Sequence, residues 1–65
     1  MRKGINGEKL KRARKKAGLK QYELGAKAGV HPSLISFAEN DRFRFDEDQL
    51  RKIAEALGVT EKDLT

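Results

Sequence analysis

Cysteine is absent from this 65-residue sequence, and proline and histidine occur only once each. Without cysteine, the chain can form neither disulfides nor thiolate sites. No apolar run approaches the roughly 18 residues that a helix needs to cross a bilayer. The basic residues near the start have no apolar segment behind them, so the sequence predicts no signal peptide and a cytoplasmic location.

Charge is abundant and unevenly distributed. The chain has 15 Lys and Arg against 10 Asp and Glu, a net charge of +5. Residues 1–20 hold nine basic residues and one acid, whereas residues 46–65 hold three basic residues and six acids. A strongly basic end favours a polyanionic partner, but a run of lysines can equally solvate the outside of a helix. Charge alone leaves both interpretations open.

Helix-start signals recur with the spacing of a hydrophobic staple, in which an apolar residue before the N-cap contacts another five positions later. The five pairs are Ile5–Leu10, Leu19–Leu24, Val30–Ile35, Phe45–Leu50 and Val59–Leu64. Asn6, Asp46 and Thr60 are good N-caps because a short side-chain oxygen accepts from the free amides of the first turn. Lys20 and His31 are poor caps by this standard. Those two starts therefore depend on the staple and on the residues that follow; after His31, Pro32 falls at the first helical position, where its missing N–H costs nothing.

Glycines mark the predicted helix ends. Gly18, Gly29 and Gly58 each follow a helical stretch, as expected for the left-handed residue that ends a helix, and Asn40-Asp41 can take that role once. The pattern predicts helices at about 7–17, 21–28, 32–39, 47–57 and 61–64, and strand alternation is not evident. We expect an all-α fold of five helices, forming a single domain over residues 1–65.

The second and third predicted helices are separated by only Gly29-Val30-His31, which is the helix-turn-helix pattern. Across about Leu10 to Leu64 the chain resembles the phage-repressor-like family of Cro and cI type, also called the xenobiotic response element family. The residues that carry the resemblance are Leu10, Arg14, Gly18, Leu19, Gln21 and Leu24, then Gly29, Val30, Ile35 and Glu39, then Leu50, Ile53, Ala54, Leu57, Gly58 and Val59. The resemblance implies a compact lambda-repressor-like domain that binds double-stranded DNA as a homodimer and regulates transcription, most often as a repressor.

The resemblance also assigns roles to matching positions. The recognition helix, 32–39, would enter the major groove with Pro32, Ser33 and Phe37 at base edges. Phosphate contacts are expected from Lys20, Gln21, Tyr22, Ser36, Asn40, Arg42 and Arg44. Arg14 and Glu39 match a structural ion pair of the family. The helical pattern is consistent with this ion pair. Arg14 shares a predicted face with Leu10 and Ala17, where an unpaired guanidinium would be costly.

Four positions depart from the family pattern, and one of them is Phe45, near which the family commonly has a proline. Lys20 replaces the usual Ser or Thr cap, and a cation at the positive end of a helix is unfavourable unless an anion such as phosphate lies nearby. Asp41 replaces a glycine, which makes the end of the recognition helix harder to predict. Gly25 replaces an alanine; it preserves close packing but weakens its helix by roughly 0.5–1 kcal/mol.

Several site residues have a second interpretation. Phe37 can touch a thymine methyl group, contact a protein partner, or fold back over Ala38 into the core. Gln21 and Tyr22 can contact phosphates or simply be exposed. Arg42 and Arg44 can clamp phosphates or pair with Asp41 and Asp46 on the surface, where such pairs are worth only about 0–1 kcal/mol. The five basic residues Lys9, Lys11, Arg12, Lys15 and Lys16 lie outside the family's main contact surface and are expected to add long-range attraction.

Enzymatic chemistry has little support in the sequence. His31 lies at a turn without a nucleophile or metal-binding cluster near it in sequence, and the acids of residues 46–48 lack a calcium-loop pattern. No catalytic residue, metal, cofactor, small-molecule ligand or membrane contact is predicted. The alternative to a DNA-binding regulator is a protein-interaction module or an antitoxin component that keeps the fold with weak base readout, and the apolar side chains Pro32, Leu34 and Phe37 motivate it.

Overall fold

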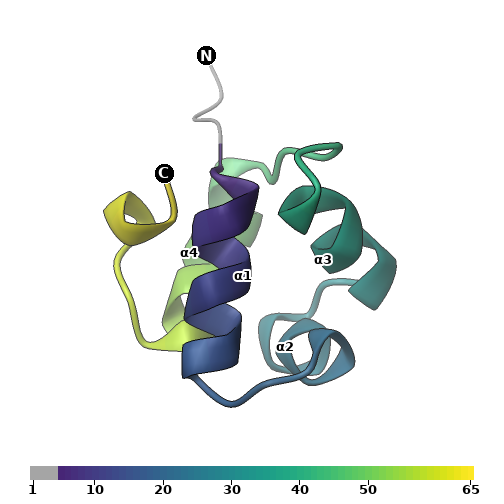
Figure 1. The fold of residues 1–65 in the computed structure, drawn as a ribbon, viewed down its shortest axis with the longest axis vertical. Helices are drawn as coiled ribbons and strands as arrows, with labels where there is room; N and C mark the ends of the chain where they lie inside the picture. The colour runs from purple at the N-terminus through teal and green to yellow at the C-terminus, as the bar shows by residue number, and fades with distance from the viewer. Residues whose placement is uncertain (1–4) are drawn as a thin grey trace.

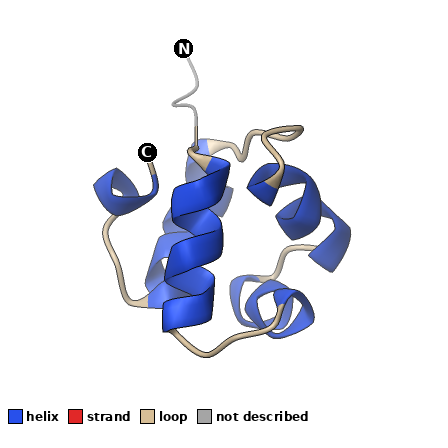
Figure 2. Ribbon diagram, in the orientation of Figure 1, coloured by secondary structure: helices blue, strands red, loops and turns tan. Residues whose placement is uncertain are grey.

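The computed structural model describes residues 5–65 and contains four α-helices in that range: α1 (Gly7–Lys16), α2 (Gln21–Ala28), α3 (Pro32–Glu39) and α4 (Glu47–Leu57). A short 3₁₀ helix, η1 (Glu61–Leu64), follows α4. Figure 2 shows helices joined by short loops, without a strand in the described range. The all-α prediction is confirmed. Arg2 and Lys3, which belong to the basic end of the sequence, lie outside the described residues.

The prediction of five helices is wrong in its last member. In η1 the N–H of Asp63 donates to the carbonyl of Thr60 at 3.0 Å, a bond between residues three apart, as in a 3₁₀ turn. Four residues are too few for a series of α-helical bonds. The Thr60 N–H donates to the Asp63 carboxylate at 3.0 Å. This bond holds the pKa of Asp63 below its ordinary value, so its stabilisation is lost as the pH falls through that lowered pKa.

The N-caps explain why the helices begin where they do. Asn6 accepts from the N–H of Lys9 at 3.1 Å, and Asp46 accepts from Gln49 at 2.7 Å, as the sequence predicts. The two poor caps are supported differently. At His31 the ring atom Nδ1 accepts from the N–H of Ser33 at 3.1 Å. At Lys20, which has no acceptor, the backbone N–H donates to the Glu23 carboxylate at 2.8 Å.

All four α-helices end in the same way. The residue after the left-handed position donates its N–H to a carbonyl five positions back, which is the Schellman arrangement. The four bonds join Leu19 to Arg14, Val30 to Gly25, Arg42 to Phe37 and Val59 to Ala54. Glycine is the left-handed residue three times, whereas Asp41, with φ of 59°, takes this place after α3. The predicted stop at Asn40-Asp41 is confirmed.

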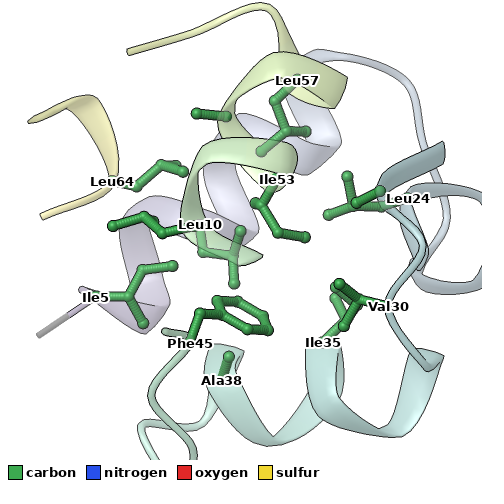
Figure 3. Packing of buried hydrophobic residues seen from close by; sticks show 13 residues of the cluster. Ile5, Leu10, Leu24, Val30, Ile35, Ala38, Phe45, Ile53, Leu57 and Leu64 are labelled. Carbon is green, nitrogen blue, oxygen red and sulfur yellow. The ribbon is translucent and has the colours of Figure 1, made fainter. Parts of the chain in front are cut away.

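One hydrophobic cluster joins all the helices. Figure 3 shows Leu10, Ile53 and Leu64 directed toward one another, with Phe45 and Ile35 beneath them. Eight of the ten staple residues are buried, so the staples both start the helices and fill the core. In Figure 1, α1 lies at the front, α2 and α3 to one side, and η1 to the other. α1 contacts α3 and η1, while α2 contacts α3 and α4.

The longest of these helices, α4, has 11 residues, and no helix within residues 5–65 is long and apolar enough to cross a membrane.

Candidate nucleic-acid interface

A glycine sets the distance between α2 and the turn that leads into α3. A Cβ atom added at Gly25 would lie 2.5 Å from the carbonyl oxygen of Val30 and 3.3 Å from the nitrogen of Pro32. Because both atoms belong to the backbone, alanine at this position would require the turn to move. Gly25 therefore does more than preserve close packing in general, since it permits the close approach of α2 to the turn at Val30–Pro32.

The side of α3 that faces outward carries the predicted reading residues. Ile35 and Ala38 are fully buried, whereas Ser33 is exposed and Phe37 is 49% exposed. The interpretation that Phe37 completes the core is therefore wrong, and contact with DNA or with a protein remains. Pro32 is half-buried. A shallow hollow on this surface is lined by Gln21, Pro32, Ser33, Ser36 and Phe37.

A buried ion pair ties α1 to the end of α3. The guanidinium of Arg14 donates from Nε to Oε2 of Glu39 at 2.5 Å and from Nη2 to Oε1 at 3.2 Å. The remaining terminal nitrogen, Nη1, donates to the carbonyl of Leu19 at 2.8 Å. The Arg14 residue is 8% exposed, so the pair lies largely out of solvent. The structure thus brings Arg14 and Glu39 together in a two-pronged pair that also holds the α1–α2 turn.

The same carboxylate holds Gln21 at the start of α2. Nε2 of Gln21 donates to Oε1 of Glu39 at 3.1 Å, the oxygen that also accepts from Arg14. A carboxamide nitrogen carries two hydrogens, so this bond leaves one for a phosphate oxygen. This contact is not among those that the sequence predicts. The chemistry of Glu39 indicates that a further donor can bind there, because a carboxylate has about four acceptor positions and one arginine does not occupy them all.

Asp41 connects the end of α3 to the start of α1. Its carboxylate oxygen Oδ1 accepts from the N–H of Gly7 at 2.9 Å. A Cβ atom at Gly7 would lie 2.5 Å from the carbonyl oxygen of Glu39 and 2.6 Å from that of Ala38. The left-handed backbone of Asp41 ends α3, and its carboxylate binds the start of α1. The departure from the family's glycine therefore has a structural reason.

The loop after α3 exposes two arginines. Within residues 5–65, no ion pair joins Arg42 or Arg44 to Asp41 or Asp46, so the surface-pairing interpretation is wrong. The two acids have other partners, the N–H groups of Gly7 and Gln49. The rings of Phe43 and Phe45 pack edge to face at 5.4 Å, and Phe45 is 2% exposed. This aromatic pair anchors the loop while both guanidiniums face solvent.

The other predicted phosphate residues lie on two segments beside α3. At the start of α2, Lys20 is exposed, and Tyr22 is 61% exposed. Asn40 donates from Nδ2 to the carbonyl of Ser36 at 2.8 Å, which uses one of its two amide hydrogens. No group of three or more His, Asp or Glu side chains within residues 5–65 is arranged to hold a metal ion. The predicted contact residues thus come from the start of α2, from α3 itself and from the loop after it.

Comparison with known proteins agrees with this geometry. A family model described as Helix-turn-helix matches residues 10–64. Comparison with curated protein sequences gave no match. Among solved structures, the restriction-modification controller protein C.AhdI from Aeromonas hydrophila superposes with a TM-score of 0.86 at 25% identity, covering 91% of this chain and 89% of that one.

Two further structures extend the likeness. The biofilm regulator SinR, solved in complex with DNA, has a TM-score of 0.81 at 32% identity and covers 86% of this chain and 90% of its own. The DNA-binding domain of the P22 c2 repressor has a TM-score of 0.85 at 27% identity and covers 100% of this chain and 92% of its own.

Proposed function

Since the chain belongs to the Cro/cI-type helix-turn-helix family, we propose that it is a transcription regulator that reads double-stranded DNA by placing α3 in the major groove. The observation that carries this proposal is the outward face of α3 lying beside Gln21 at the start of α2. That arrangement puts base-reading and backbone-holding groups on one surface. A selection from random duplex DNA should enrich a half-site, and binding should weaken steeply with salt.

Base reading would fall to Ser33 and Phe37, with Pro32 beside them. A serine hydroxyl can donate to or accept from base edges, and a phenyl ring can contact a thymine methyl group. Proline offers no side-chain hydrogen bond. Because this set has few hydrogen-bonding groups, the sequence-dependent shape of DNA would contribute part of the selectivity.

The backbone contacts would fix the register of α3. Lys20 and Gln21 lie at the start of α2, where helix amides and the helix dipole favour an anion. The other proposed phosphate contacts are Tyr22, Ser36, Asn40, Arg42 and Arg44. Such contacts position a protein on DNA without reading sequence. The hydrogen bond that Gln21 donates to Glu39 would orient the Gln21 carboxamide before DNA binds, so less side-chain entropy is lost on binding.

We also propose that residues 1–65 act as one domain and bind as a homodimer to a two-fold site, in the cytoplasm at the nucleoid. Two copies of α3 would then enter successive major grooves about 34 Å apart. Repression is the expected outcome where such a site overlaps a promoter.

Phe37→Ala is expected to relax half-site selectivity with little loss of stability. The ring is 49% exposed, so its removal leaves no cavity in the core. One lost contact with a thymine methyl group should reduce discrimination at one position by about 0.8 kcal/mol, the value for burying one such carbon. Selection from random duplexes and thermal melting measure the two effects. Tyr22→Ala is the matched control, because Tyr22 is also exposed but is proposed to contact backbone only. Unchanged selectivity in the Phe37 variant would count against base reading by this ring.

Arg42→Gln/Arg44→Gln is expected to weaken binding to all duplexes alike. Each phosphate contact contributes about 0.9 to the slope of log affinity against log salt, so two lost contacts should make that slope shallower by about 1.8. Lys52→Gln/Lys62→Gln removes the same charge from α4 and η1 and serves as the control. Equal slopes in the two double variants would show that the loop arginines do not touch DNA.

A protein partner is the second candidate for this surface. The half-exposed Phe37 on a helix with few polar reading groups favours it. In that case the chain would bind random duplex DNA weakly or without salt dependence, and Phe37→Ala would abolish partner binding.

A further inference from the structure

The outer side of α1 is strongly basic. Leu10 and Arg14 turn inward and are buried, whereas Lys9, Lys11, Arg12, Lys15 and Lys16 are exposed. At 3.6 residues per turn, these five side chains share about half of the helix circumference. We call these five residues the α1 basic face. Within residues 5–65, its one ion pair joins Arg12 to Glu8 at 3.0 Å.

This arrangement opposes the stability of α1. Lys11 and Lys15 are four residues apart, as are Arg12 and Lys16, and like charges at this spacing repel. Cations at the end of a helix interact favourably with its dipole, but Lys9 and Lys11 lie in the first half of α1, where that benefit is absent.

The exposed side of α4 is also highly charged and provides a comparison for α1. There the charges alternate and pair: Arg51 with Asp48 and Glu55, and Lys52 with Asp48. α1 departs from this pattern, and local conflicts of this kind concentrate at functional surfaces.

Part of the α1 basic face is directed away from the proposed reading surface. Arg14 turns toward α3, where it meets Glu39. On the other flank of α1, Lys16 lines a hollow with Val59 and Asp63, and the charge of Lys9 acts on Asp63 of η1. Figure 1 shows α1 at the front, with η1 and α3 on opposite sides of it. A duplex held by α3 would therefore leave Lys9, Arg12 and Lys16 available.

We propose that the α1 basic face binds the phosphate backbone of a second duplex DNA segment, without reading its sequence, while α3 holds the first. This inference rests on the proposed function. α1 has 10 residues and is about 15 Å long, and an equal length of duplex axis carries about four phosphates of each strand. The face carries only charged side chains, whereas protein interfaces are depleted of lysine and centre on apolar anchors. A polyanion therefore fits it better than a protein, and the regulator would bridge two DNA segments.

The test uses a complex of the full chain with a saturating amount of its selected duplex. A second, labelled duplex without that site is then titrated at several salt concentrations. The wild type should bind it. Lys9→Gln/Arg12→Gln/Lys16→Gln should bind it less tightly, with a log–log salt slope shallower by about 2.7 for three lost contacts. Lys27→Gln/Lys52→Gln/Lys62→Gln removes the same charge from α2, α4 and η1 and should behave as the wild type.

Three outcomes would overturn the inference. The first is that the wild-type complex does not bind the second duplex, and the second is that the two triple variants bind it equally. The third is that the wild-type complex binds a labelled single-stranded RNA, titrated in the same way, more tightly than the duplex. Equal binding would be expected if the two α3 helices of a dimer held separate duplexes. The half-site enriched by each variant is measured in parallel. An enriched half-site without second-duplex binding rejects this inference alone, whereas absence of any enriched half-site rejects the proposed function.

Discussion

Glu39→Gln is expected to lower the free energy of unfolding by about 3–5 kcal/mol, because it leaves the Arg14 guanidinium buried without its counter-charge. Arg14 is 8% exposed, and the Glu39 side chain is 3% exposed, so water cannot replace the lost partner. The amide of the variant keeps one acceptor oxygen but presents an N–H₂ group where the second oxygen was. In a small domain this loss is comparable with the total stability. Urea and thermal unfolding followed by circular dichroism measure it.

The double variant Arg14→Met/Glu39→Met separates the charge from the packing. Replacing both partners with apolar groups removes the desolvation cost along with the attraction, so it should recover most of the stability. It also removes the acceptor that holds Gln21. Its DNA affinity should therefore stay below that of the wild type even though it folds. Glu8→Gln is the control, because the Glu8–Arg12 pair is 75% and 77% exposed and should change stability little. Wild-type stability in Glu39→Gln would contradict a structural role for the pair.

Gly7→Ala is the second large effect we expect, a loss of about 1–3 kcal/mol from overpacking. The added carbon would meet three oxygens, those of Glu39, Ala38 and the Asp41 carboxylate, at 2.5, 2.6 and 2.8 Å. Two of them belong to the backbone at the end of α3, so relief requires α1 and α3 to separate. At about 4–8 °C per kcal/mol for a domain of this size, the melting temperature should fall by roughly 5–20 °C.

Gly18→Ala provides the comparison for Gly7→Ala. Gly18 has φ of 73°, but in the described part of the chain nothing lies within 4 Å of an added Cβ. Its cost is that of a left-handed alanine, about 1–2 kcal/mol, without a steric clash. Only Gly7→Ala should also alter DNA selectivity, because only that clash displaces α3. A Gly7 variant as stable as the wild type would show that α1 and α3 have room to separate.

The positions of the helices could be predicted because their starts and ends are set by neighbours in sequence. Caps such as Asn6 and Asp46 bond three residues ahead, and the residue that ends each helix lies within its last turn. The errors were also local. His31 caps α3 with a ring nitrogen, an acceptor that cap preferences do not anticipate, and four residues at 61–64 were too few for an α-helix.

The candidate site was less predictable, because its chemistry depends on side chains that meet across the fold. The sequence placed Gln21, Phe37 and Arg42 at the ends and outer face of the helix-turn-helix. It left open whether Phe37 is buried and whether Arg42 is paired. Both depend on contacts made by neighbouring residues. Ile35 and Ala38 fill the core beneath α3, so Phe37 stays outside it. The Asp41 carboxylate accepts a hydrogen bond from the N–H of Gly7 and, among the described residues, is not paired with Arg42.

The helices, the helix-turn-helix and the basic character of α1 follow from residues a few positions apart, so they can be predicted without knowing the fold. Tertiary structure alone decided that Gln21 is held by Glu39 and that Asp41 binds Gly7. Those contacts join residues 18 and 34 positions apart. Their geometry exists only after the core has brought α1, α2 and α3 together, because hydrogen bonds require atoms within about 3 Å and suitably aligned.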